Sequence, residues 1–497
     1  MKLIKQKIID NRYNVKYFCF PDIEEHELLF LIKNPTEFFN LNNSFGFIIE
    51  DVKEKTFLIV SDMFSTVKIY YTENPFKPSF EISENNLLSK KALKYYVSYR
   101  YIPAPLTFYH NVYCVPPGSV LKISVDGKKE WIKNSFDFNK QHINDEEFEQ
   151  YIESVMGKFL GSEYFNNAGI FLSGGMDSSG VSYFYSKYNK TILNAHSIIF
   201  PDKKFDENIF SSSVCSKFGI NHIKHELKAQ DFIDFWEKMP QIYSQPVSTH
   251  TGAGFNKILK NSKQHVFLSG YGGDEIFGGD IKYTHCLILE KFNKYIKKSG
   301  FDNENFNMEE KWQSFIRFYN TDEFIKMEKL ETSLSSMINF NLCNWQPDYE
   351  NFVLNNLAFY YEKIPVHPYL LPEFVKKING LKNKFKINGA ITRYIYRKWI
   401  SKIFGQDFAF RQSQGFSAPL NEFFRNELKS YADEKINSFL KRNQFEQILD
   451  YNEIKAKKES VLKGENTYNY ILSIIILENF LQNLERKKLH ENSFHIC

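Results

Sequence analysis

The first part of the chain is dominated by the alternating apolar pattern that is typical of strands. Residues 45–62 (FGFIIEDVKEKTFLIVSD) predict two apolar strands joined by a charged turn. Residues 125–132 (VDGKKEWI) predict a hairpin, because Asp126-Gly127 is a favoured two-residue turn. From 144 to 160 the pattern changes, and apolar residues recur three and four positions apart. This spacing predicts a helix and marks the end of the strand-rich part.

Strand and helix patterns alternate after residue 165. The expected parallel strands are AGIFL, ILNAHSIIF, INHIKHEL and HVFLSG, and ENIFSSSVCSKFG between them has a helical pattern. This alternation predicts an α/β fold with a doubly wound parallel sheet, ligand at the carboxyl ends of the strands, and a helical extension from 285 onward. We place the domain boundary in the polar stretch NSFDFNKQHIND, which divides the chain into residues 1–140 and 141–497.

A glycine- and serine-rich turn follows the first predicted parallel strand. The string SGGMDSS (173–179) comes directly after the apolar run 168–172, and we expect a helix from Gly180. Glycines allow a ligand to approach the backbone, and free N–H groups at a helix start favour phosphate. A carboxylate at Asp177 repels phosphate unless a cation lies between them, which indicates Mg²⁺. The alternative is an ordinary strand-turn-helix corner capped by serine and aspartate.

A second loop of the same kind lies at 266–280 (VFLSGYGGDEIFGGD). A predicted buried strand ends at Ser269 and Gly270, and the loop then delivers Asp274 and Glu275. Alone it could be a glycine-rich loop with solvated acids. Two strand ends that each deliver an aspartate favour closure on one Mg²⁺–triphosphate from two sides. The two loops together therefore predict a nucleotide site.

Composition and charge exclude several classes of protein. The 497 residues carry 63 basic and 59 acidic side chains, so the net charge of +4 gives no basic footprint for nucleic acid. The six cysteines are scattered without a CxxC pair, which favours neither a zinc site nor a disulfide framework. The N-terminus turns polar too early for a signal peptide, and the apolar run 470–477 is too short to cross a membrane. We expect a soluble cytoplasmic protein whose run at 470–477 is a buried helix.

The two loops resemble a known family. SGGMDSS resembles the PP-loop motif of enzymes that cleave ATP between the α and β phosphates, and SGYGGDEIFGG resembles the second motif of the asparagine synthetase family. The likeness extends to AHSIIFPDKKFDENIFSSSVCSKFGINHIKHEL, HPYLLPEFV and RQSQGFSAPL. It implies that a substrate carboxylate attacks the α-phosphate of ATP, that pyrophosphate leaves, and that an amine attacks the acyl-adenylate. The implied cofactors are ATP and Mg²⁺.

The resemblance also implies roles for individual residues. The expected metal ligands are Asp177, Asp274 and Glu275. The expected pyrophosphate contacts are Ser173, Gly174, Gly175, Ser178 and Ser179. The expected adenosine contacts are Leu172, Ile198, Ser269 and Gly270. Arg397 in RYIYRKW occupies the position of a family arginine, so it is either a phosphate contact or a solvated charge on a helix.

The N-terminal part resembles the family's glutamine amidotransferase domain in outline. This implies a degenerate, glutaminase-type αββα domain of the Ntn-hydrolase kind. The family nucleophile is a cysteine exposed at position two, and this chain has Lys2 there. Cys19 is not at a chain end and cannot supply the free α-amine that serves as base. We expect a domain that keeps its fold and has lost glutamine hydrolysis.

Departures from the family pattern bear on the substrate. Members that use aspartate generally carry an acidic residue where this chain has Tyr271, and the tyrosine is the pattern of β-lactam synthetase and carbapenam synthetase. In those enzymes the tyrosine works with a glutamate, which aligns within one residue of Glu350. One position counts against this resemblance: this chain has Ser413 where the family has a lysine.

Lasso peptide cyclases, relatives that also lack the terminal cysteine, join a side-chain carboxylate to a peptide amine. The resemblance therefore favours lactam or macrolactam formation on a small-molecule or peptide substrate, with a precursor peptide and a leader-processing protein as partners. The alternatives are asparagine synthesis with ammonia or an external glutaminase, a non-catalytic nucleotide-binding protein, and a PP-loop enzyme that modifies tRNA. The near-neutral charge and the second motif count against the last of these.

Overall fold

The structure, a computed structural model, describes most of the chain. The described residues are 2–82, 87–124, 126–133, 143–200, 208–280, 282–288, 332–412, 418–464, 468–487 and 495–496. The elements of the N-terminal part are β1 (Lys5–Ile9), β2 (Tyr13–Phe20), α1 (Glu25–Lys33), η1 (Pro35–Asn40), β3 (Ser44–Asp51), β4 (Thr56–Ser61), β5 (Tyr70–Glu73), β6 (Phe76–Ser79), β7 (Leu87–Leu88), α2 (Lys90–Tyr99), β8 (Val112–Cys114), β9 (Ser119–Ser124) and β10 (Lys129–Lys133).

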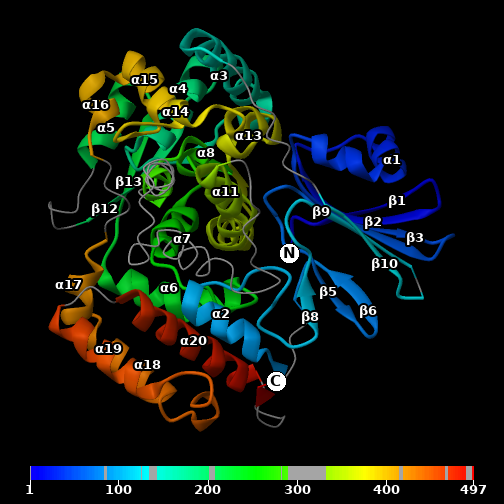
Figure 1. Cartoon of the computed structure of the whole chain (residues 1–497), viewed down its shortest axis with the longest axis vertical. Helices are drawn as coiled ribbons and strands as arrows, with labels where there is room; N and C mark the ends of the chain where they lie inside the picture. Colours follow the sequence, from blue (N-terminus) through cyan, green and yellow to red (C-terminus); the bar gives the residue numbers. More distant parts are fainter. Residues whose placement is uncertain are drawn as a thin grey trace, which may run out of the picture.

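Two antiparallel sheets make up most of the N-terminal part, which lies on one side of the molecule (Figure 1). The larger sheet has the order β1-β2-β3-β4-β9-β10, and the smaller one has the order β6-β5-β8. The predicted pair at 45–62 forms the β3–β4 hairpin, and β9 pairs with β10 across the turn at Gly127, so both predictions are confirmed. The predicted domain boundary falls at 134–142 and lies outside the described residues.

The remaining elements build a parallel sheet and the helices around it. Up to the last sheet strand they are α3 (Asp145–Leu160), η2 (Glu163–Phe165), β11 (Gly169–Phe171), α4 (Met176–Tyr188), β12 (Asn194–Ile199), α5 (Asn208–Phe218), β13 (Asn221–Glu226), α6 (Ala229–Ile242), α7 (Thr251–Asn261), β14 (Val266–Leu268), α8 (Gly273–Phe277), α11 (Ser333–Phe340), η4 (Asn341–Glu350), α12 (Asn351–Tyr360) and β15 (Ile364–Val366). After β15 they are η5 (Pro368–Leu370), α13 (Pro372–Asn379), α14 (Asn383–Lys386), β16 (Ile387–Asn388), β17 (Ile391–Thr392), α15 (Tyr394–Phe404), α16 (Gln406–Phe410), α17 (Leu420–Arg425), α18 (Lys429–Phe439), η6 (Asn443–Phe445), α19 (Tyr451–Lys463), α20 (Tyr468–Lys487) and β18 (His495–Ile496).

The parallel sheet has the order β13-β12-β11-β14-β15. The chain first adds strands on one side of β11 and later returns to add β14 and β15 on the other side. The strand order therefore reverses next to β11, and in open α/β sheets ligands bind at such a reversal, beyond the carboxyl ends of the strands. The loops after β11 and β14 are the two glycine-rich loops, so the topology brings them together.

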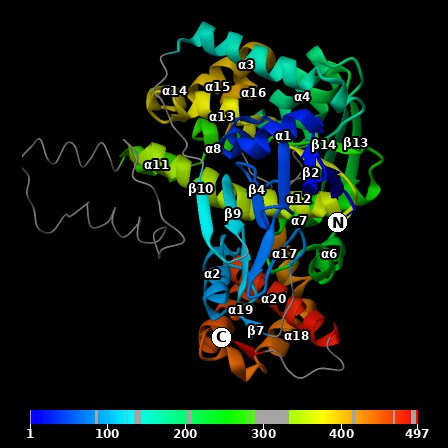
Figure 2. The same ribbon diagram turned by 90° about the vertical axis from the view of Figure 1, so that its right-hand side faces the viewer.

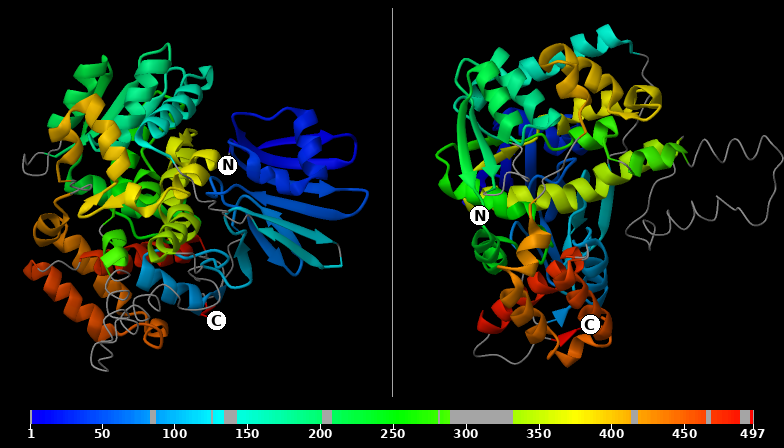
Figure 3. Two further views of the ribbon diagram at one scale, coloured as in Figure 1. Left: turned by 45° about the horizontal axis from the view of Figure 1, so that its top comes forward. Right: turned by 90° about the vertical axis from the view of Figure 1, so that its left-hand side faces the viewer.

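The predicted helix at 144–160 is α3, which Asn144 and Glu147 begin with a reciprocal capping box. The helices α11, η4 and α12 follow one another without a break and form one long helical rod, visible in the right-hand view of Figure 3. Its middle segment, η4, is π-helical. Such segments are rare and occur frequently at functional sites. Figure 2 shows the end of this rod, α12, behind the N-terminal strands.

One hydrophobic core connects the N-terminal sheets with the parallel sheet. The ring of Phe18 from β2 meets the ring of Phe359 from α12 edge to face, with centroids 5.1 Å apart. The predicted buried helix near the C-terminus is α20, and its residues 471–477 are buried on all sides. The Tyr96 hydroxyl of α2 donates to the Ser473 carbonyl in α20 at 2.8 Å. Among the described residues, no helix is both long enough and apolar enough to span a membrane.

Candidate active site

The first glycine-rich loop turns sharply between β11 and α4. Gly174 has a φ of 81°, and a Cβ there would lie 2.7 Å from the Ser211 amide nitrogen, so only glycine fits without strain. The helix begins at Met176 and not at the predicted Gly180, because Gly175 already adopts the extended conformation of an N-cap residue. Asp177 consequently lies in the first helical turn, where backbone N–H groups lack intrahelical partners.

Serine hydroxyls surround the start of α4. Ser173 Oγ accepts the Gly175 N–H at 3.1 Å and lies 3.3 Å from Ser178 Oγ. Ser179 Oγ is buried and makes no hydrogen bond. Hydroxyl donors beside the positive end of a 13-residue helix favour an anion such as phosphate. The loop therefore has the donor chemistry of a phosphate site.

The second loop packs directly against the first. A Cβ at Gly273 would lie 2.4 Å from Asp177 Oδ1, and a Cβ at Gly270 would lie 2.7 Å from the Ser178 amide nitrogen. These glycines are therefore required for the two loops to interlock. Asp274 and Glu275 lie in the first turn of α8, which begins at Gly273. The topology thus delivers both predicted aspartates to one place.

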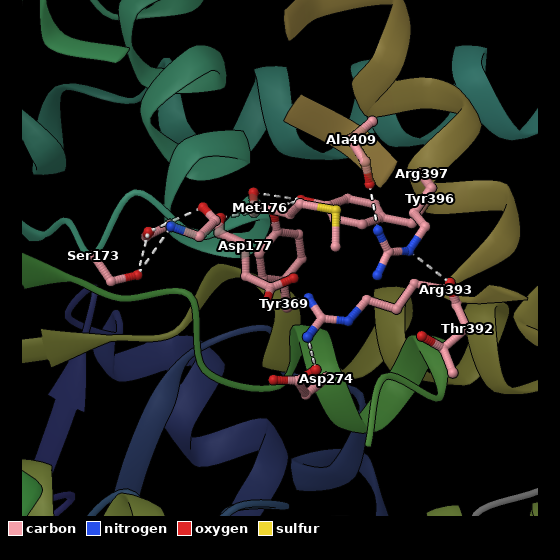
Figure 4. Close-up of polar contacts among 12 residues, drawn as sticks. Ser173, Met176, Asp177, Asp274, Tyr369, Thr392, Arg393, Tyr396, Arg397 and Ala409 are labelled. Atoms are coloured by element: carbon pink, nitrogen blue, oxygen red, sulfur yellow. Dashed lines mark hydrogen bonds and ion pairs between the residues drawn. The ribbon is translucent and has the colours of Figure 1, made fainter. Parts of the chain in front are cut away.

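A single guanidinium joins the two aspartates (Figure 4). Arg393 Nη1 donates to Asp177 Oδ2 at 2.7 Å, and Arg393 Nη2 donates to Asp274 Oδ1. Arg393 directly precedes α15 and has a left-handed φ of 54°. The second carboxylate oxygen of Asp177, Oδ1, is buried and has no hydrogen-bond partner among the described residues.

The residues present fit a divalent cation. An orphaned carboxylate oxygen is costly to bury, and a hard cation would satisfy it. Asp177 and Asp274 could hold Mg²⁺ if Arg393 released them. Among the described residues, no group of three or more His, Cys, Asp or Glu side chains forms a metal site before such a movement.

Burial perturbs the acids of the site. It raises the pKa of Asp177, and the charge of Arg393 opposes this increase. Burial also raises the pKa of Glu275 to about 7, against the charge of Lys282. Carboxyl groups with raised pKa values beside a cavity are typical of functional sites. Asp177 and Glu275, one acid from each loop, therefore lie where a bound cation would strongly favour the charged form of the carboxyl group.

A cavity of about 420 Å³ opens in front of the two loops. The predicted site residues that line it are Leu172, Ser173, Gly175, Asp177, Ser178, Ile198, Ser269, Gly270, Tyr271, Asp274, Glu275 and Glu350. The cavity also reaches α7, where it contacts Thr251 and Phe255. Three further predicted residues, Gly174, Ser179 and Arg397, are not among its described lining residues. Most of the predicted site therefore converges on one space.

Tyr271 and Glu350 lie at the same cavity, although 79 residues separate them in the sequence. Burial raises the pKa of the Tyr271 phenol well above its usual range, and the negative charge of Glu350 and its hydrogen bond to the phenol add to the effect. Burial likewise raises the pKa of Glu350, while the hydrogen bond to Tyr271 opposes this. Tyr271 and Glu350 thus form an acid–phenol pair in which each side chain shifts the pKa of the other.

Two further arginines near the site, Arg397 and Arg411, donate to backbone carbonyl groups. Arg397 Nε donates to the Thr392 carbonyl at 2.9 Å and Arg397 Nη1 donates to the Ala409 carbonyl, so its guanidinium holds backbone (Figure 4). A phosphate contact from Arg397 stays a prediction. Arg411, from the RQSQGF segment, donates to the Gly174 carbonyl at 2.7 Å and lies over the Phe210 ring at 3.6 Å. Arg411 therefore braces the first loop.

Sequence reasoning missed Arg393 and His367. Arg393 lies four residues before Arg397, the arginine that the family pattern singles out. Their side chains point in different directions because Arg393 precedes α15 and Arg397 lies within it. His367 follows β15, a three-residue strand that contains Pro365 and was not predicted. His367 is the first residue of HPYLLPEFV, one of the segments that carry the family resemblance. Its position just beyond the end of a strand is the signal that could have identified it as a site residue.

Lys2 and Cys19 are the residues on which the predicted loss of glutamine hydrolysis rests. The Lys2 side chain is 81% exposed and pairs with Glu362. Cys19 is buried, and burial raises its pKa to about 12, so a thiolate does not form near neutral pH. The predicted loss of glutamine hydrolysis stays a prediction. Ser413 lies outside the described residues.

Comparison with known proteins identifies the family. The family model for asparagine synthase matches residues 165–482, which is more than half of the chain. The chain therefore belongs to the asparagine synthase family. The match covers the parallel sheet, both glycine-rich loops and the helices up to α20.

Individual relatives are distant. Glutamine-hydrolyzing asparagine synthetase 1 of Bacillus subtilis is 26% identical over 269 residues, covering 51% of this chain and 42% of that protein. A Methanocaldococcus jannaschii protein provisionally named as asparagine synthetase 2 is 27% identical, covering 44% of each chain. The chain thus spans less than half the length of these two relatives. A solved U34-tRNA thiolase from Methanococcus maripaludis covers 57% of this chain and 90% of its own, at 14% identity. Its TM-score of 0.21 is too low to support any argument.

Proposed function

We propose that the protein is an ATP-dependent ligase that forms amide bonds by adenylating a carboxylate. Family membership and the convergence of both loops on one cavity support this reaction. The substrate carboxylate oxygen attacks the α-phosphorus of ATP, and the bond from that phosphorus to the β-phosphate oxygen breaks, releasing pyrophosphate. An amine nitrogen then attacks the acyl carbon, AMP leaves, and the nitrogen loses a proton.

The residues divide this work along the cavity. Ser173, Ser178 and the N–H groups that begin α4 bind the pyrophosphate portion. Asp177 and Asp274, with Glu275 nearby, would hold Mg²⁺ once Arg393 moves away, and the ion would supply positive charge to the phosphates. Leu172, Ile198, Ser269 and Gly270 bound the adenosine portion.

The Tyr271–Glu350 pair is the observation that supports the second half of the reaction. An ammonium group must lose a proton before it can attack, and a positioned acid–base pair at the cavity can accept it. Burial keeps the Cys19 thiol protonated near neutral pH, so Cys19 is not a glutaminase nucleophile, and we infer that the amine belongs to the substrate. Ring closure to a lactam or macrolactam, of the β-lactam synthetase or lasso peptide cyclase type, is therefore the proposed outcome. A precursor peptide and a leader-processing protein would then be its partners.

A second candidate is asparagine formation from aspartate with ammonia or an external glutaminase, and the names of the relatives favour it. The antiparallel sheets of residues 5–133 support a degenerate glutaminase-type domain within the proposed division at residue 140. A nucleotide-binding protein without turnover is the third candidate. It requires that the Tyr271–Glu350 pair have no chemical role.

Carboxylate-dependent formation of AMP and pyrophosphate tests the proposal. The purified protein would be given MgATP with L-aspartate, with β-amino acids that carry both reacting groups, and with peptides that contain an aspartate or glutamate side chain. Hydroxylamine added in parallel traps any acyl-adenylate as a hydroxamate. We expect AMP, pyrophosphate and hydroxamate with at least one dual-function substrate. Asparagine formed from aspartate and ammonia alone would select the second candidate, and ADP as the product would contradict adenylation.

A further inference from the structure

A loop of the N-terminal part contacts η4 and α12, the two helical segments that meet at Glu350. Asp62 shapes this loop, which we define as residues 62–68, by accepting the N–H groups of Phe45, Phe64 and Thr66 at 2.8, 3.1 and 2.9 Å. Asp62 is buried, so these bonds fix the backbone inside the protein. Loop 62–68 therefore presents its carbonyl groups in a defined direction.

Three polar side chains on one helical face receive the loop. Asp348, Asn351 and Asn355 are spaced three and four residues apart, which places them on the same side of η4 and α12. Asn351 Nδ2 donates to the Phe64 carbonyl and Asn355 Nδ2 donates to the Thr66 carbonyl, both at 3.1 Å. All three side chains are buried. Because Glu350 lies between Asp348 and Asn351 in the sequence, this contact also fixes the backbone that carries Glu350.

A buried ion pair adds to the contact. Lys68 Nζ lies 2.5 Å from Asp348 Oδ1, and the side chains are 6% and 5% exposed. The other carboxylate oxygen of Asp348 accepts the Ala104 N–H at 2.9 Å. A buried pair of this kind tolerates little displacement, because separating the charges leaves each one unpaired in a low-dielectric interior. The ion pair therefore sets the register between loop 62–68 and the helix.

A chain of hydrogen bonds continues from Asn355 to Tyr271. His367 Nε2 lies 2.8 Å from Asn355 Oδ1, and His367 Nδ1 lies 2.7 Å from Ser269 Oγ. Ser269 Oγ accepts the Tyr271 N–H at 3.2 Å. The His367 and Tyr271 rings also contact each other, tilted by 33° with centroids 5.6 Å apart. The loop is thus linked to the residue that opposes Glu350.

The donor and the acceptor of each hydrogen bond between Thr66 and Tyr271 can be assigned by starting from the Thr66 carbonyl. A carbonyl can only accept, so Thr66 orients the Asn355 amide with its oxygen toward His367. That oxygen requires a proton on His367 Nε2. Burial lowers the pKa of His367 to about 3, so the ring is neutral and Nδ1 accepts from the Ser269 hydroxyl. The Ser269 oxygen is then free to accept the Tyr271 N–H.

We propose that loop 62–68 of the N-terminal part is the positioning element that fixes Tyr271 and Glu350 relative to each other. It acts on Glu350 through Asp348 and Asn351, and on Tyr271 through Asn355, His367 and Ser269. This role rests on the proposed function, in which the pair accepts the proton of the amine. In this proposal the N-terminal part, for which we predict no glutamine hydrolysis, contributes to acyl transfer by positioning the pair.

A fluorine label at position 271 tests the proposal without any substrate. 3-Fluorotyrosine is placed at position 271 of the full chain, and its ¹⁹F resonance is recorded in wild-type and variant backgrounds. Asn355→Leu removes the link to Thr66 and His367. Asn356→Leu is the matched control, because Asn356 bonds only to the Phe352 carbonyl of its own helix in the described contacts. His367→Leu cuts the same chain at a second point, so the test does not depend on one variant folding.

The expected result is loss of the wild-type resonance in Asn355→Leu and His367→Leu, with Asn356→Leu unchanged. His367→Gln restores a donor and an acceptor in the same order, so it should bring the resonance back toward wild type. An unchanged resonance in both leucine variants overturns the proposal, as does an equal change in Asn356→Leu.

A kinetic readout separates this proposal from the proposed function. With a carboxylate that supports AMP formation, Asn355→Leu should slow acyl transfer ~10²-fold and leave adenylation near wild type, because only the pair is displaced. Equal losses in both half-reactions would contradict a positioning role. If no carboxylate supports AMP formation although the fluorine results hold, the proposed function fails while the structural link stands.

Discussion

Replacing Arg393 with methionine separates the guanidinium from the two aspartates and tests whether they form a cation site. Asp177 and Arg393 are 16% and 6% exposed, so the substitution leaves a nearly buried carboxylate unpaired. Breaking such a pair costs about 3–5 kcal/mol. Asp274 is 48% exposed and adds little, so we take about 3 kcal/mol for the unfolding free energy.

This cost should appear as a lower melting temperature. Unfolding entropy is about 2.1 cal/mol/K per residue, or about 0.75 kcal/mol/K for a cooperative unit of about 350 residues. A loss of about 3 kcal/mol then lowers Tm by about 4 °C. Mg²⁺ without nucleotide should restore part of the loss, because the freed carboxylates can bind it. At ten times its Kd the gain is RT ln 11, or about 1.4 kcal/mol and about 2 °C.

The assay is differential scanning fluorimetry with and without MgCl₂, with CaCl₂ and NaCl at matched ionic strength. Arg397→Met is the matched control, since this arginine bonds backbone carbonyls and its loss frees no carboxylate. We expect it to lower Tm without any recovery by Mg²⁺. If Arg393→Met melts like wild type, or if Mg²⁺ raises Tm equally in both variants, the two-aspartate cation site is wrong.

Three further outcomes follow from the site. Glutamine should yield no glutamate above background in a coupled dehydrogenase assay, because burial raises the pKa of Cys19 to about 12 and keeps its thiol protonated; measurable turnover would refute this. Tyr271→Phe should slow amide formation by at least ~10²-fold while pyrophosphate exchange into ATP persists, and a wild-type product rate would remove the phenol from the mechanism. The unfolding free energy should fall as the pH drops from 6.5 to about 4, because burial lowers the pKa of His196 from 6.5 to about 4 and the unfolded chain binds the proton first. The difference is worth about 3 kcal/mol, and urea titrations should show a smaller loss of stability over this pH range in His196→Gln than in wild type, because His367 contributes to both.

The parallel sheet and both loops were predictable because each rests on a local signal. The strands β11, β12 and β14 are largely buried and read as apolar runs, and the glycines and aspartates that follow β11 and β14 mark the strand ends. The fifth strand, β15, was not predicted, because three residues that include Pro365 carry no periodic pattern. The start of α4 was misplaced by four residues, since Gly175 serves as the N-cap without a capping side chain.

Contacts between segments that are distant in the sequence could not be predicted. Arg393 and Arg397 are one helical turn apart, and nothing local indicates that the first reaches both loops while the second holds backbone. The route from Thr66 to Tyr271 joins residues from four separate segments, and within their own segments Thr66, Asn355 and His367 carry no signal that they are connected. Such networks depend on tertiary packing, which neither periodicity nor motif spacing encodes.

Transfer of ¹⁸O from a substrate carboxylate to AMP tests the central claim, adenylation of a carboxylate, most directly. A carboxylate that supports ATP turnover is labelled in both oxygens, incubated with MgATP and the protein, and the AMP is analysed by mass spectrometry. Attack of a carboxylate oxygen on the α-phosphorus, followed by acyl transfer to the amine, leaves one ¹⁸O in the phosphate of AMP. We predict AMP with one ¹⁸O per amide formed. Unlabelled AMP, or ADP in place of AMP, would contradict the mechanism.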